Sequence, residues 1–115
     1  TGAYLARIQE YENMPVAPEL EGLQNRLKSM ASKYAACVTQ ITEAKDQELL
    51  DFCARRLVEM AAHIIMGHLM VQDASKSDLF SESAQVYVRY AEAEVEKHIN
   101  FIRKFDKDDL AYYRK

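Results

Sequence analysis

Apolar residues recur along most of the chain at the three- and four-residue intervals of an amphipathic helix. The clearest stretch runs from about residue 18 to residue 44, and its spacing predicts a bundle helix with one buried face. That face carries Leu20, Leu23, Leu27, Met30, Tyr34, Cys37 or Val38, and Ile41. A shorter helix is expected over residues 3–12, with Tyr4, Ile8 and Tyr11 on its apolar side.

Two further long helices are expected over about residues 47–74 and 79–105. The main face of the first carries Leu50, Cys53, Leu57, Ala61, Ile64 and Val71. Its second apolar face, with Phe52, Met66 and Met70, indicates contacts from several directions or a subunit interface. The last helix is expected to bury Phe80, Ala84, Tyr87, Ala91, Val95, Ile102 and Phe105. Residues 106–113 are expected to form a cap and a short final turn.

Helix-breaking and capping residues mark the connections between these segments. Pro15 and Pro18 predict a stiff connector after the first helix, with Pro18 in the first turn of the next one. Asp46 is a plausible N-cap, so we expect a break near residue 45. One continuous helix is the alternative there, because neither Gly nor Pro interrupts the chain. Ser77 or Asp78 is expected to cap the last helix.

The composition agrees with few, long helices. Only three Gly and two Pro occur in 115 residues, too few for the many turns of an all-β domain. We therefore predict an all-α, up-down helical bundle of three long helices and a short N-terminal helix. Residues 1–115 are expected to form this single domain, with residues 1–17 as a possible linker and short helix.

Charge and cysteine usage narrow the partners and the compartment. The net charge of −3 argues against a nucleic-acid binder, which normally shows a basic patch. The apolar runs are too short to span a membrane, and no secretory signal is visible. Cys37 and Cys53 show no CxxC spacing and are expected to be buried and reduced, which indicates a cytoplasmic protein. An oxidised pair is the alternative.

A carboxylate-bridged di-metal site is the natural function to test in a helical bundle, and it needs Glu-x-x-His motifs. The chain lacks them, since Met60, Ile65 and Val95 stand three positions before His63, His68 and His98. If the last two long helices form a hairpin near residue 76, His68 and His98 lie about 20 Å apart in height. No metal site is therefore predicted.

Local roles are expected for these polar and small residues instead. His68 and His98 are interpreted as histidines at the edge of the core, and Glu94, Arg55 and Arg56 are expected to form an ion-pair cluster near His98. Gly67 indicates a close helix crossing rather than a ligand site. The methionines at helical spacing are expected to fill the core rather than to line a binding groove. They are Met30, Met60, Met66 and Met70.

No Gly-rich phosphate loop, nucleophile elbow or Ser/His/Asp arrangement is visible. We therefore assign no catalytic, cofactor-binding or metal-ligating residue in this chain. Glu92, Glu94 and Glu96 spread around their helix and are expected to be mostly solvated.

Three segments carry a resemblance to a known family. Residues 53–61, 64–74 and 80–98 resemble the C-terminal helical extension of some bacterial acyl-CoA dehydrogenases, and the likeness covers roughly residues 20–105. In that family a helical bundle follows the flavin-binding core, which holds both the flavin pocket and the catalytic glutamate. The resemblance therefore implies no catalytic or cofactor residue here, and FAD only in the parent protein.

What the resemblance implies is a C-terminal fragment of a longer chain. The parent would oxidise fatty acyl-CoA to 2-enoyl-CoA, and this accessory bundle would pack on the upstream core or on a neighbouring subunit. A homo-oligomer is also expected, because the second apolar face of the third helix is larger than one core needs. Two alternatives stay open. One is a free-standing bundle that dimerises or binds a protein partner, and the other is a ligand-binding bundle that uses Gly67 and His68.

Overall fold

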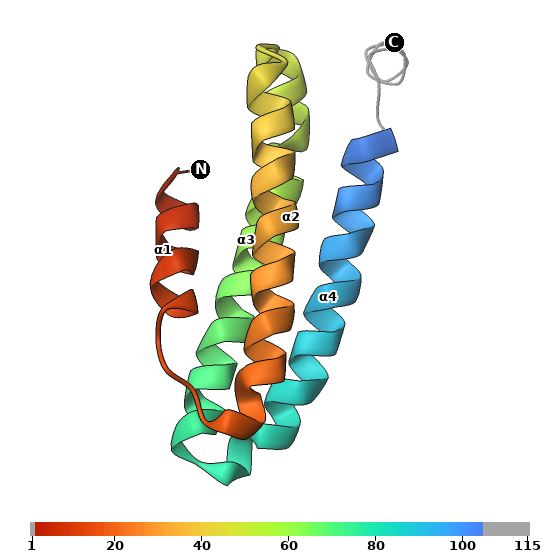
Figure 1. Cartoon of the computed structure of the whole chain (residues 1–115). Helices are drawn as coiled ribbons and strands as arrows, with labels where there is room; N and C mark the ends of the chain where they lie inside the picture. Colours follow the sequence, from red (N-terminus) through yellow and green to blue (C-terminus); the bar gives the residue numbers. More distant parts are fainter. Residues whose placement is uncertain (1, 105–115) are drawn as a thin grey trace.

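Four α-helices account for most of the protein in the computed structural model, which describes residues 2–104 (Figure 1). They are α1 (Gly2–Glu12), α2 (Glu21–Glu43), α3 (Gln47–Lys76) and α4 (Ser81–Lys104). Short 3₁₀ turns, Pro18–Leu20 and Asp78–Phe80, precede α2 and α4. Between residues 2 and 104 there is no strand, and the predicted all-α bundle is confirmed.

Helices α2, α3 and α4 pack against one another in pairs, and α3 contacts every other helix. The short α1 lies along α2 and α3, on the side of the bundle away from α4 (Figure 1). The resulting molecule is elongated, with extents of 52, 23 and 16 Å. Because α1 covers only the groove between α2 and α3, the other two grooves of the bundle are left to side chains of their own helices.

The connections form where capping residues predict them. Lys45 adopts the left-handed conformation, with φ of 52°, and so ends α2. The Asp46 carboxylate accepts hydrogen bonds from the backbone N–H groups of Glu48 and Leu49, which starts α3. The Ser77 hydroxyl accepts one from the N–H of Leu79. The predicted break near residue 45 is therefore confirmed, while α3 extends two residues beyond its expected end.

Most of the predicted core is buried, although Leu23 and Leu50 are only partly buried and several other positions differ. Tyr4 is exposed, and Leu5 packs against the core in its place. Both residues fit a helix that buries Ile8, so the packing of α1 on α2 and α3 decides between them. Phe80 is also exposed, because it lies in the 3₁₀ turn where the chain has not yet entered α4.

In α4 the core also takes Val88 and Ile99, which the expected face omitted, while Tyr87 is only partly buried. The expected position of Phe105 and the final turn over residues 106–113 lie outside the described residues. Cys37 and Cys53 are buried free thiols, and burial raises the pKa of each. This arrangement agrees with the reduced state that their spacing predicts.

Gly67 of α3 lies directly against Leu27 of α2. A Cβ atom added there would lie 2.6 Å from Cδ2 of Leu27, which is fully buried. Ordinary contacts between carbon atoms are about 3.5–4.0 Å long. The glycine therefore makes room for Leu27 at the crossing, in agreement with the role expected from the sequence.

Candidate functional site

The three grooves of the α2–α3–α4 bundle differ in what fills them. The α2–α3 groove is covered by α1, which contributes Ile8 to the core. Across the α2–α4 groove, Arg26 pairs with Glu92 at 3.4 Å, and Lys33 pairs with Glu96. The α3–α4 groove is divided between a polar cluster near the C-terminal end of α4 and an apolar stretch near its start. The candidate sites therefore lie between α3 and α4.

His98 is the centre of the polar cluster and is buried. Its Nδ1 lies 3.1 Å from Nη1 of Arg56, and its Nε2 lies 3.0 Å from Oε2 of Glu59. Because a guanidinium can only donate, Nδ1 must accept and the ring proton must lie on Nε2. The pKa of His98 is lowered, chiefly by burial and further by the Arg56 and Lys97 charges, although Glu59 opposes this. His98 is therefore neutral and holds one orientation.

Arg56 is held from a second side by aromatic rings. Its guanidinium carbon lies 3.6 Å from the centre of the Phe101 ring, and Phe52 stacks on Phe101 with centroids 6.2 Å apart. Cation–π contacts of this kind stabilise by about 0.5–2 kcal/mol. We define the polar cluster by the residues that line its cleft of about 390 Å³: Phe52, Arg55, Arg56, Glu59, Lys97 and His98.

A buried or half-buried ion-pair cluster of Glu94, Arg55 and Arg56 was expected near His98, and it is confirmed only in part, because Glu59 takes the place of Glu94 and the Arg55 side chain is 90% exposed. Glu59 contacts His98 and also accepts from Nε of Arg55 at 3.2 Å, whereas Glu94 pairs with Lys97 at 2.7 Å. The hydrogen bond from Lys97 lowers the pKa of Glu94. Sequence analysis missed Glu59, although its position four residues after Arg55 is typical of a helical ion pair. Because these charges pair among themselves, the cluster joins α3 to α4.

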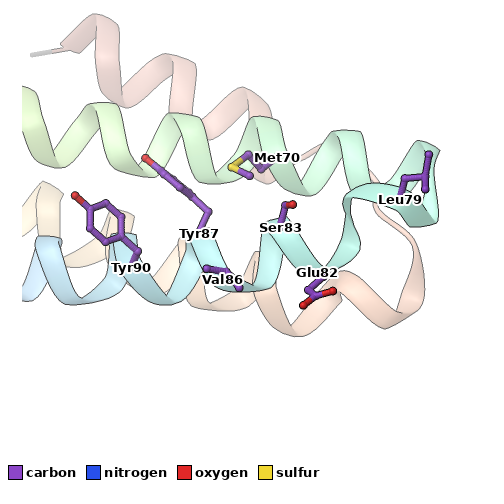
Figure 2. A pocket seen from close by; sticks show the side chains of 7 residues that line it. All are labelled: Met70, Leu79, Glu82, Ser83, Val86, Tyr87 and Tyr90. Atoms are coloured by element: carbon purple, nitrogen blue, oxygen red, sulfur yellow. The ribbon is translucent and has the colours of Figure 1, made fainter.

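The apolar groove occupies the other half of the α3–α4 surface and measures about 540 Å³. Figure 2 shows its lining, with Met70 on α3 and the remaining side chains on α4 or the turn before it. The lining residues are Met70, Leu79, Glu82, Ser83, Val86, Tyr87 and Tyr90. One wall is fixed by His63, whose Nδ1 lies 3.1 Å from the Tyr87 hydroxyl oxygen.

Large apolar side chains of this groove remain open to solvent. Leu79 is 85% exposed, Val86 54% and Tyr90 52%. The methionines divide between two environments, since Met30 and Met60 fill the core, while Met66 is exposed and Met70 lines the groove. The expectation that all four fill the core is therefore wrong for Met66, whereas Met70 is partly buried and packs against the core as well as lining the groove. The second apolar face of α3 was the sequence feature that could have indicated this exposure. No helix among residues 2–104 packs on that face beside Met66.

His68 lies on the opposite side of α3, under α1. Its ring stacks on Tyr11 with centroids 6.0 Å apart, and its Nε2 has no hydrogen-bond partner among the described residues. Burial, together with the Lys28 charge, lowers the pKa of His68 to about 4. The described part of the chain contains no group of three His, Cys, Asp or Glu side chains that could hold a metal ion. His68 is thus a neutral core residue that packs α1 onto α3.

Comparison with known proteins gives the family. Residues 1–110 match the family model for the acyl-CoA dehydrogenase C terminal. The chain belongs to this family. It is also similar to a solved structure, the acyl-CoA dehydrogenase family protein from Porphyromonas gingivalis, with a TM-score of 0.87 and 48% identity. That alignment covers 91% of this chain and 91% of the other. A search of curated proteins gives no match.

The family match extends the resemblance noted in the sequence. It begins at residue 1 rather than near residue 20, so it includes α1 and the connector to α2. This agrees with the packing, because α1 contributes Ile8 and Tyr11 to the buried interior. No helix among residues 2–104 is both long and apolar enough to cross a membrane. The acyl-CoA dehydrogenase C-terminal domain is thus an accessory domain built from four packed helices.

Proposed function

We propose that this chain is the non-catalytic C-terminal accessory bundle of a flavin-dependent acyl-CoA dehydrogenase. In this proposal the catalytic core lies upstream in the same chain, binds FAD and oxidises fatty acyl-CoA to 2-enoyl-CoA. The bundle packs on that core and supports a site built elsewhere. The match of nearly the whole chain to the dehydrogenase C-terminal family is the observation that carries the proposal.

The chemistry of the described residues supports this division of labour. The oxidation requires a flavin ring held against the β carbon and a carboxylate base at the α proton. Residues 2–104 contain no strand and hence no strand–turn–helix unit of the kind that holds a dinucleotide. Glu59 and Glu94, the carboxylates near the polar cluster, are paired with neighbouring cations. The buried free thiols support a cytoplasmic location for the enzyme.

A direct test compares this chain with the product of its natural gene. The purified chain should be colourless and inactive with acyl-CoA and an artificial electron acceptor. The full gene product should be yellow, release FAD on denaturation and reduce the acceptor. A flavin bound stoichiometrically by residues 1–115, or a natural gene that starts near Thr1, would overturn the proposal.

A free-standing helical bundle is the second candidate. It is favoured by the solved relative from Porphyromonas gingivalis, which is matched over 91% of its own length and is therefore of similar size. Under this alternative the chain acts through a protein partner and needs no core. The natural gene decides between the two, because only the accessory domain requires an upstream flavin-binding region.

A further inference from the structure

The apolar groove between α3 and α4 has a surface that can pair with itself. We propose that α4 binds the α4 of a second copy, antiparallel, around a two-fold axis that passes near Val86. The resulting interface buries Leu79, Val86 and Tyr90 from each chain. This homodimer goes beyond the accessory role proposed above, because it concerns a contact between two copies of this domain rather than its contact with a core.

Large apolar side chains of the groove are exposed, and no element among residues 2–104 covers them. On the other side of α3, the α2–α3 groove is filled by the amphipathic α1. Groove surfaces of this bundle therefore accept a helix laid along them. The α3–α4 groove has no such helix among residues 2–104, and it leaves Leu79, Val86 and Tyr90 more than half exposed. Contiguous apolar surface of this kind is typical of protein–protein contacts.

The order of side chains on α4 identifies the second copy as the occupant. Glu82, Val86 and Tyr90 follow one another at four-residue intervals and so share one face of the helix. Figure 2 shows Glu82 and Tyr90 on opposite sides of Val86 along α4. A two-fold axis at Val86 therefore brings Glu82 of each copy opposite Tyr90 of the other.

This pairing is chemically complementary. The Tyr90 hydroxyl can donate a hydrogen bond to the Glu82 carboxylate, and the symmetry produces that bond twice. An axis at Glu82 would instead bring two carboxylates together. Arg89, the nearest cation on α4, lines the surface towards α2 rather than this groove. The register centred on Val86 is thus the one that this face favours.

The proposed register limits the contact to one end of each elongated bundle. With the axis at Val86, the two bundles overlap from about residue 77 to residue 95, or about 27 Å at 1.5 Å per residue. This is about half of the 52 Å length of the molecule. We therefore expect a dimer with a dissociation constant in the micromolar range.

Sedimentation equilibrium of the 115-residue chain from about 1 to 200 μM tests the proposal. The apparent mass should rise with concentration from 13.2 kDa towards twice that value. Val86→Glu should give a monomer over this range. The matched control is Val58→Glu, because Val58 is 48% exposed on α3 but does not line the groove. That variant should retain the wild-type association.

A charge exchange then tests the register. Glu82→Lys should weaken dimerisation at least tenfold, and Tyr90→Glu should abolish it by placing two pairs of carboxylates together. The double variant E82K/Y90E should recover the dimer through two Lys–Glu pairs and lose it again as salt increases. Circular dichroism should show unchanged helix content in every variant, since positions 58, 82, 86 and 90 are all exposed.

Two results would overturn the proposal. One is a monomer mass for the wild type at every concentration. The other is a pattern of variants that does not fit the proposed register: the Val86→Glu variant still dimerises, or the double variant E82K/Y90E fails to recover the dimer. Neither result bears on the flavin chemistry of the natural gene product, so the accessory role is tested separately.

Discussion

Replacing Gly67 by alanine should destabilise the bundle, although alanine is the better helix former. The new Cβ atom would lie 2.6 Å from Cδ2 of Leu27, on the facing surface of α2. Leu27 is fully buried, so its methyl group must move by about 1 Å within a packed interior to restore ordinary contact. The substitution therefore sets a gain in backbone entropy against overpacking at one helix crossing.

The two terms can be estimated separately. Alanine in a helix interior is more stable than glycine by about 1 kcal/mol. Extra carbon atoms in a well-packed core typically cost about 1–3 kcal/mol. The balance is a loss of about 1 kcal/mol in the free energy of unfolding, which lowers the melting temperature of a domain this size by about 4 °C.

Gly22 offers the same substitution without the crowding. A Cβ atom there meets nothing within 4 Å, and no glycine of the described chain has a positive φ. Gly22→Ala should therefore raise the free energy of unfolding by about 0.5 kcal/mol. Urea unfolding followed by circular dichroism at 222 nm measures both variants against the wild type.

Leu27→Val identifies the atom responsible, because valine lacks the δ methyl groups. By itself this change should cost about 1–2 kcal/mol through lost packing. In that background, Gly67→Ala should become stabilising by about 1 kcal/mol. The reasoning fails if Gly67→Ala stabilises the wild type as Gly22→Ala does, or if it remains destabilising beside Val at position 27.

Three further predictions concern buried and capping groups. The unfolded chain protonates His68 below pH 6.5, while the folded protein does so only near pH 4, so about 3 kcal/mol of stability should be lost as pH falls through this window. His68→Leu should remove most of this pH-dependent loss of stability, as measured by urea titrations, and leave only the smaller loss due to His98. A loss of unchanged size in this variant would contradict the low pKa of His68. Arg56→Met should lower the free energy of unfolding by about 1–2 kcal/mol. The matched change Arg55→Met, at an exposed position, should lower it by less than about 0.5 kcal/mol. Equal losses would count against a stabilising role of the polar cluster. Asp46→Ala should cost about 1 kcal/mol in thermal unfolding, with Asp46→Asn as the control that keeps the cap.

Two errors of the sequence analysis show where helical periodicity stops being informative. Phe80 falls on the apolar face if the spacing of α4 is extended backwards, but a 3₁₀ turn has three residues per turn and rotates it outwards. Tyr4 and Leu5 fit the periodicity of α1 equally well, and only the packing of α1 against α2 and α3 selects Leu5. Such choices depend on neighbours that are distant in sequence.

The position of the polar cluster along α3 and α4 was predictable, but its contacts were predictable only in part. The hairpin register places position 98 level with position 55, one residue from the observed contact between His98 and Arg56. Height along a helix follows from a constant rise per residue, so it can be counted from the turn. Direction around the helix is less certain, and the approach of Glu59 rather than Glu94 to His98 came only from the packed pair of helices.

The sequence by itself determined the helices and their connections, because a period of 3.6 residues and capping groups such as Asp46 act within a few residues of chain. It also indicated a second apolar face on α3. Only the tertiary structure decided which apolar side chains stay exposed, since burial depends on which helix lies opposite. Met60 and Met66 have the same side chain on the same helix, yet Met60 is buried in the core and Met66 faces solvent. The difference is that α1, α2 and α4 pack on α3 from three sides, while nothing else among residues 2–104 covers the side that carries Met66.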